Sequence, residues 1–172
     1  AEVVGQLTKS GHIGVLATSG TIKSDSYRLE IQKLHPECHV TGLACPMWVP
    51  IIENGEHDKP GADYFVRDRI EALLAADPLI DTIILGCTHY PLLTEVVAEI
   101  MGPDVTLVSA GEESAFELKR MLKANGLRAD ENRQGEAEFF VSDRAEDFER
   151  IASVFLQEDL RRAARRIDID QY

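Results

Sequence analysis

One stretch of the chain decides the fold: Asp81-Thr82-Ile83-Ile84-Leu85-Gly86-Cys87-Thr88-His89-Tyr90, followed at once by Pro91. The apolar, β-branched run at residues 80–85 predicts a buried strand, because turn residues bound it on both sides. Gly86 ends this strand, and Pro91 is typical of the first turn of a helix. The stretch therefore places a thiol, a hydroxyl and an imidazole at a strand-to-helix turn, where ligands bind in open parallel sheets.

The rest of the chain alternates between short apolar runs and longer amphipathic segments, which is typical of βαβ units. We therefore predict an α/β fold with a three-layer αβα arrangement, in which helices cover both faces of a parallel sheet. The expected strands are residues 12–17, 39–43, 80–85, 105–108 and 138–141. The expected helices are residues 22–34, 48–53, 63–76, 91–101, 113–125, 145–156 and 158–166, with a charged loop at residues 128–136.

The composition is that of an ordinary globular protein, with 44% hydrophobic and 28% charged residues among 172. A formal net charge of −12 argues against a nucleic-acid partner or an anionic membrane surface. No apolar run approaches the length of a membrane span. The three cysteines, Cys38, Cys45 and Cys87, lack a paired C-x-x-C framework, which favours a reducing, cytoplasmic setting. Cys38 and Cys45 also lack histidines at a matching spacing, so we predict no metal site.

Cys87 is the leading candidate for chemistry, since the N-terminus of a helix favours the thiolate, which is the reactive form. A small buried apolar residue is the plainer interpretation of any single cysteine. The Gly86-Cys87-Thr88-His89 turn after an apolar strand favours the functional interpretation. His89 could polarise the thiol, protonate it or hold a carboxylate, and its plainer role is to cap a loop carbonyl.

Three threonines and one glutamate belong to the same predicted edge. Thr18 and Thr21 follow the first strand, Thr88 follows the third, and Glu53 ends the segment after the second. All of these loops leave the carboxyl ends of parallel strands, so they can converge on one ligand. The threonine hydroxyls could bind that ligand or cap helices. Glu53 could orient His89, bind an ammonium group or lie exposed at a helix end.

Four blocks of the sequence resemble the glutamate racemase family, within the aspartate/glutamate racemase superfamily. They follow the order and spacing of that family, and the block around Cys87 is the most specific. The blocks are residues 13–24 with Tyr27, residues 44–53, residues 84–92 and, more weakly, residues 105–111. The C-terminal stretch at residues 139–156 also resembles the ending of the family.

The resemblance implies a cofactor-independent proton transfer at the α-carbon of glutamate, which supplies D-glutamate for bacterial peptidoglycan. Inversion needs one group that removes the proton from one face and another that delivers a proton to the opposite face. Cys87 matches the second of the two cysteines that the family uses, and Thr88 and His89 match positions that touch the substrate and assist the thiol. Thr18 and Thr21 match hydroxyls that line the pocket, and Glu53 matches a flanking acid.

The family's first half, with the opposing cysteine, has no counterpart among these residues. We therefore interpret the chain as the C-terminal part of a glutamate racemase. Residues 1–90 are expected to form the second domain, and residues 91–172 a return segment that completes the first. Such a chain is expected to be inactive alone, to need the missing N-terminal half as its partner, and to expose strand edges that invite self-association into a homo-oligomer.

Two other functions fit the residues without the resemblance. The first is a thiol hydrolase or transferase in which Cys87 is the nucleophile and His89 its base. The second is a non-catalytic module that recognises a small dicarboxylate through Thr18, Thr21 and Thr88. Solvent deuterium exchange at Cα of glutamate distinguishes the racemase interpretation from both.

Overall fold

The computed structural model describes residues 1–130, 132–133 and 135–171. These residues divide into two compact units, residues 1–127 and residues 128–172. The predicted loop at residues 128–136 includes Glu131 and Gln134, which lie outside the described residues. Within the described part of the chain, no helix is both long and apolar enough to cross a bilayer.

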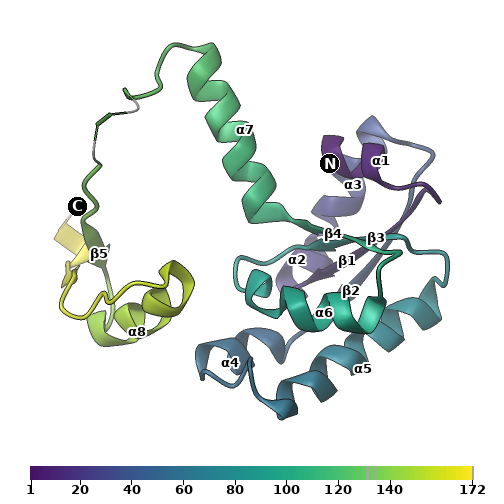
Figure 1. Ribbon diagram of the computed structural model, residues 1–172, viewed down its shortest axis with the longest axis horizontal. Coiled ribbons are helices and arrows are strands. Elements are labelled where there is room, and N and C mark those ends of the chain that lie inside the picture. The colour runs from purple at the N-terminus through teal and green to yellow at the C-terminus, as the bar shows by residue number, and fades with distance from the viewer. Residues whose placement is uncertain (131, 134, 172) are drawn as a thin grey trace. The chain divides into compact units, whose positions relative to one another are not determined.

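The first unit contains a parallel sheet of four strands in the order β2-β1-β3-β4 (Figure 1). The strands are β1 (His12–Ala17), β2 (His39–Ala44), β3 (Thr82–Leu85) and β4 (Thr106–Ser109). The helices of this unit are α1 (Glu2–Leu7), α2 (Ser19–Ser24), α3 (Ser26–Leu34), α4 (Trp48–Glu53), α5 (Pro60–Ala76), the 3₁₀ helix η1 (Tyr90–Leu93), α6 (Thr94–Met101) and α7 (Ala110–Ala124).

Helices cover both faces of this sheet. Alternate residues of each strand point to opposite faces, so apolar side chains on each face pack against helices. On one face, Ile13, Val15 and Ala17 pack with Val4 of α1 and Ile31 of α3. On the other face α5 approaches β1 so closely that a Cβ on Gly14 would lie 2.8 Å from Leu73 Cδ2. The predicted α/β class with a three-layer αβα arrangement is confirmed.

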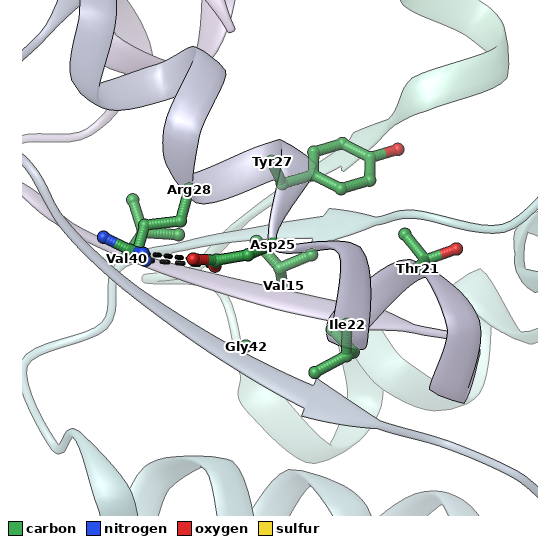
Figure 2. A pocket seen from close by; sticks show the side chains of 8 residues that line it. All are labelled: Val15, Thr21, Ile22, Asp25, Tyr27, Arg28, Val40 and Gly42. Carbon is green, nitrogen blue, oxygen red and sulfur yellow. Dashed lines mark hydrogen bonds and ion pairs between the residues drawn. The ribbon is translucent and has the colours of Figure 1, made fainter.

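The predicted helix over residues 22–34 is wrong as a single element. The chain forms α2 and α3, separated by Asp25 in the left-handed region with φ of 56° (Figure 2). Aspartate is among the few residues other than glycine that adopt this conformation readily. Helix α2 begins at Ser19, earlier than expected, because Thr18 caps it by accepting a hydrogen bond from the Thr21 backbone N–H.

The second unit contains β5 (Phe139–Val141), α8 (Ala145–Leu156), β6 (Ala164–Arg166) and the 3₁₀ helix η2 (Ile169–Gln171). The predicted helix at residues 158–166 is wrong, because β6 pairs in parallel with β5. Gln157 and Arg162 both have positive φ, which an α-helix cannot include. The buried Glu149 carboxylate accepts a hydrogen bond from the Ala164 backbone N–H at 3.0 Å.

The predicted boundary at residue 90 concerned the domains of a longer protein, whereas the two compact units of this chain divide after residue 127. Strand β4 pairs in parallel with β3, so residues 106–109 belong to the same sheet as β1, β2 and β3 and to the first unit. The predicted helix at residues 91–101 forms as η1 followed by α6. That residues 91–172 complete another domain of a longer protein stays a prediction.

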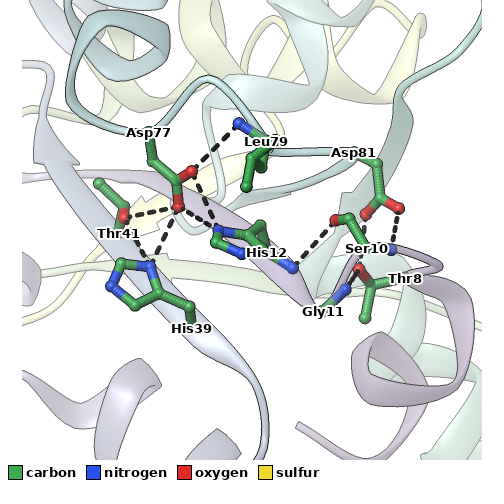
Figure 3. Close-up of polar contacts among 9 residues, drawn as sticks. All are labelled: Thr8, Ser10, Gly11, His12, His39, Thr41, Asp77, Leu79 and Asp81. Carbon is green, nitrogen blue, oxygen red and sulfur yellow. Dashed lines mark hydrogen bonds and ion pairs between the residues drawn. The ribbon is translucent and has the colours of Figure 1, made fainter.

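Asp81 ties the start of β3 to the turn between α1 and β1 (Figure 3). Its carboxylate accepts hydrogen bonds from Thr8 Oγ1 at 2.5 Å, from the Lys9 N–H at 2.8 Å and from the Ser10 N–H at 2.7 Å. Burial raises the pKa of Asp81, but these bonds and one from Thr82 Oγ1 outweigh it and lower the pKa from 3.8 to about 2. The ionised form is therefore the one that the fold stabilises.

We expect Asp81→Asn to lower the free energy of unfolding by about 1–2 kcal/mol at pH 6, after allowance for solvent screening of a partly exposed group. Because the folded pKa lies below the ordinary value, this stabilisation is complete above pH 3.8 and disappears as the pH falls through 2. Urea unfolding between pH 6 and pH 2 measures the difference, with Asp104→Asn at an exposed site as the control. A difference between wild type and Asp81→Asn that does not shrink with acid would contradict the assignment.

Candidate active site

The carboxyl edge of the sheet has a topological switch point between β1 and β3. The chain moves outward from β1 to β2 in one direction and from β3 to β4 in the other. In open α/β sheets, ligands bind in the crevice that this divergence leaves at the carboxyl ends of the strands. The loops that follow β1 and β3 flank this crevice, and the Gly86 N–H donates a 2.8 Å hydrogen bond to the Leu16 carbonyl oxygen.

Cys87, Thr88 and His89 lie on the loop between β3 and η1. The Cys87 thiol is half-buried, and its Sγ lies 4.0 Å from Nδ1 of His89. Thr88 is exposed, and its Oγ1 lies 3.4 Å from the same nitrogen. One imidazole nitrogen thus faces both the thiol and the hydroxyl, so that His89 can exchange a proton with either of them.

The other nitrogen of His89 contacts Glu53, at the end of α4. His89 Nε2 lies 3.1 Å from Oε1 of Glu53, with the two side chains 23% and 42% exposed. A carboxylate at this distance orients the imidazole ring and determines which of its nitrogens carries a proton. The structure therefore joins the loop after β3 to the segment after β2, as the sequence predicted, and forms a chain of contacts from carboxylate through imidazole to thiol.

Thr18 and Thr21 contact each other on the loop after β1. Their Oγ1 atoms lie 3.0 Å apart, and the Thr18 hydroxyl also caps α2. Thr21 lines a hollow of about 230 Å³ formed by residues of β1, β2 and the α2–α3 segment (Figure 2). The residues that line this hollow are Val15, Thr21, Ile22, Asp25, Tyr27, Arg28, Val40 and Gly42. Cys87 does not line this hollow. Asp25 and Arg28, which do line it, form an ion pair with each other.

Tyr27 is a neighbour of Cys87 for which we predicted no role from the sequence. A Cβ on Gly86 would lie 3.1 Å from Tyr27 Cε2 and 3.2 Å from Ala17 Cβ, so a glycine lets the ring approach the strand end. Burial raises the pKa of Tyr27, and the charge on a Cys87 thiolate raises it further. The sequence signal was its place beside the block at residues 13–24, but the break at Asp25 hid the direction of its side chain.

Cys45, on the segment after β2, is buried. Burial raises the pKa of its thiol to about 12, which leaves almost no thiolate at neutral pH. The Tyr90 hydroxyl donates a 3.1 Å hydrogen bond to the Cys45 carbonyl oxygen, and the Tyr90 ring packs on Trp48 with centroids 4.8 Å apart. These buried contacts hold Tyr90 in place and so support the loop that carries Cys87.

Comparison with known proteins gives the family. The sequence profile described as Asp/Glu/Hydantoin racemase matches residues 2–130. The chain belongs to the Asp/Glu/hydantoin racemase family. Both the thiol loop after β3 and the supporting α4 lie within the matched residues.

Individual members of the racemase family match over most of this chain. The glutamate racemase of Exiguobacterium sibiricum is 40% identical over 151 residues, which cover 88% of this chain and 55% of that relative. The crystal structure of glutamate racemase isoform RacE1 from Bacillus anthracis is similar with a TM-score of 0.88 and 35% identity, over 98% of this chain and 61% of that one.

A second solved racemase carries a ligand. The glutamate racemase of Francisella tularensis, solved in complex with D-glutamate, has a TM-score of 0.85 and 29% identity, over 99% of this chain and 62% of that one. The chain thus spans little more than half the length of the relatives that it matches.

We expect one thiol of this racemase-family chain to react with a thiol reagent such as DTNB under native conditions. Cys87 is half-buried, whereas Cys38 and Cys45 are 4% and 1% exposed and burial raises the pKa of both. Thiol release followed by absorbance should show one fast equivalent, and two more only after addition of denaturant. The fast phase should be absent in Cys87→Ser; its persistence there would contradict the assignment.

Proposed function

We propose that this chain supplies one of the two acid–base groups of a glutamate racemase, with Cys87 as that group. The observation that carries the proposal is the Cys87–His89–Glu53 chain of contacts at the switch point of a racemase-family sheet. A half-exposed thiol beside an imidazole can both accept a proton as thiolate and return it as thiol.

The proposed reaction is a proton transfer at the α-carbon without a cofactor. The Cys87 thiolate takes the α-proton from one face of L-glutamate, and the electron pair of the broken C–H bond remains on the substrate as a carbanion. A second acid on the opposite face then donates a proton to that carbon and forms D-glutamate. In the reverse direction, Cys87 is the thiol that donates the proton.

The remaining residues of the edge are proposed to bind and position. His89, held by Glu53, assists the Cys87 thiol and touches the substrate together with Thr88. Thr18 and Thr21 offer hydroxyl donors to a substrate carboxylate. Such neutral donors let a protein with a negative net charge bind an anionic group. The D-glutamate bound in the Francisella tularensis racemase supports glutamate as the substrate class.

The opposite acid is proposed to come from the portion of a racemase that this chain does not span. This chain covers 55% of the Exiguobacterium sibiricum relative, and its other two cysteines are buried. Alone, it is expected to be inactive; a homo-oligomer is a further expectation, because exposed apolar side chains of α7 such as Phe116 and Leu118 are open to association. The proposed product, D-glutamate, is a building block of peptidoglycan made in the cytoplasm.

The experiment is solvent deuterium exchange at Cα, followed by NMR, with L- and D-glutamate in separate samples. The chain is assayed alone and after mixing with the N-terminal portion of a glutamate racemase. We expect exchange and inversion only in the mixture. Rapid covalent labelling of Cys87 by an amino-acid ester, without Cα exchange in the mixture, would instead support a thiol hydrolase or transferase.

A further inference from the structure

Two histidines and an aspartate form a cluster at the amino edge of the sheet (Figure 3). His12 is the first residue of β1 and His39 the first residue of β2, and the two are direct partners in the parallel ladder. Paired positions on neighbouring strands place their side chains on the same face at the same height. Asp77, which follows the last residue of α5, approaches from that face.

The three side chains present their ligand atoms to one another. Asp77 Oδ2 lies 2.8 Å from His12 Nδ1 and 3.0 Å from His39 Nδ1, and the ligand atoms of all three lie within 4.8 Å of one another. Ligands bound to one Zn²⁺ at about 2.0–2.1 Å are separated by about 2.9–3.4 Å. The His12–Asp77 and His39–Asp77 pairs therefore have nearly this spacing already. The exposed His39 side chain has room to change its distance from His12.

The carboxylate is buried and held in place. The Asp77 side chain is 5% exposed, the Leu79 N–H donates to its Oδ1 at 3.1 Å, and Thr41 Oγ1 lies 3.3 Å from its Oδ2. A carboxylate held by hydrogen bonds from groups that are not themselves ligands is typical of metal-ligating aspartates.

The cluster lies at the opposite edge of the sheet from Cys87. Strand β1 runs from His12 to Ala17, and at about 3.3 Å per residue its length separates the two edges. The proposed racemase chemistry uses none of these three side chains. Their arrangement therefore needs a separate explanation, and the plainest is a histidine–carboxylate hydrogen-bond network that stabilises the sheet edge.

We propose that His12, His39 and Asp77 bind a divalent transition-metal ion, with Zn²⁺ as the best match. Two imidazoles and one carboxylate suit Zn²⁺ and Co²⁺ better than Mg²⁺ or Ca²⁺, which prefer oxygen ligands. The partial exposure of His12 and His39 leaves solvent access for the ion and for water in the remaining coordination position. The bound ion would join β1, β2 and the end of α5.

The test is titration of the whole 172-residue chain with Zn²⁺ by calorimetry and with Co²⁺ by visible absorption. We expect one ion per chain, ligand-field bands typical of four- or five-coordinate Co²⁺, and a rise in Tm of several degrees with Zn²⁺. His39→Gln is expected to weaken Zn²⁺ binding by more than about 100-fold, because loss of an outer-shell partner alone costs about 10- to 100-fold. Because the His39 side chain is 64% exposed, this variant should fold normally, and His12→Gln provides an independent second variant.

Two control variants locate the ion. His35→Gln removes a histidine that lies outside the cluster, and Cys87→Ser removes the thiol at the other edge; both should bind Zn²⁺ as wild type does. Equal binding by wild type and by both cluster variants would overturn the proposal and leave the hydrogen-bond network as the role of the cluster. A sulfur-to-cobalt charge-transfer band that disappears in Cys87→Ser, with no other bound ion, would also overturn it.

Discussion

Replacement of Cys87 by alanine is expected to slow Cα exchange and inversion of glutamate strongly when the chain is combined with the N-terminal portion of a racemase. The loss should be about 10³-fold, because a positioned acid–base group contributes about 10²- to 10⁴-fold. The thiol is half-buried and alanine is smaller, so the variant should fold as wild type does. NMR of the α-proton signal in D₂O, with each enantiomer as starting material, measures the rate.

The matched control for this loss is Cys38→Ala. Cys38 is a buried cysteine in the core beneath α1 and α3, and it has no part in the carboxyl edge. Its substitution should leave the exchange rate of the mixture within about twofold, although a buried methyl-sized cavity costs some stability. If the Cys87→Ala mixture exchanged Cα at the wild-type rate, the proton would be moved by another group and the assignment of Cys87 would be wrong.

The convergence of Cys87, His89 and Glu53 could be predicted from sequence because it follows from topology alone. Each residue lies shortly after a strand of one parallel sheet, and the carboxyl ends of such strands share an edge. The short helix Trp48–Glu53 and the helix Ala145–Leu156 also form as predicted. Local residue chemistry determines those segments, since each has a regular apolar pattern and a clear break at its ends.

Features that depend on pairing between distant segments could not be predicted. The stretch at residues 158–166 has the charges of an exposed helix, yet residues Ala164–Arg166 pair with β5, which lies far earlier in the chain. The cluster of His12, His39 and Asp77 likewise depends on the register of β1 against β2 and on where α5 ends. No short-range pattern encodes that register, so each histidine stood alone in the sequence.

Trp48→Ala is expected to be the most destabilising single substitution near the site. Trp48 has no exposed surface, its Nε1–H donates a 3.2 Å hydrogen bond to the Phe65 carbonyl oxygen, and its ring packs on Tyr90. Truncation of a buried tryptophan costs about 3–5 kcal/mol. That cost is a large part of the total stability of about 5–15 kcal/mol that a domain of this kind has. Urea unfolding followed by far-UV circular dichroism measures it.

Two further variants show whether the cost belongs to the buried ring. Trp48→Phe keeps an aromatic ring against Tyr90 but removes the hydrogen bond to the Phe65 carbonyl oxygen and part of the buried ring, so it should cost about 1–3 kcal/mol. Tyr64→Ala removes an aromatic ring that is 71% exposed and should stay within about 0.5 kcal/mol of wild type. A Trp48→Ala chain that loses less than about 1 kcal/mol would show that this part of the core repacks freely.

The same substitution should affect the site before it unfolds the chain. Trp48 and Glu53 are the two ends of α4, and the Tyr90 ring that packs on Trp48 directly follows His89. Loss of the indole therefore loosens both partners of the 3.1 Å contact between His89 Nε2 and Glu53 Oε1. Trp48→Ala should change the rate at which DTNB labels Cys87 at temperatures where its far-UV spectrum is still native. Trp48→Phe, which keeps the ring contact, should label close to the wild-type rate.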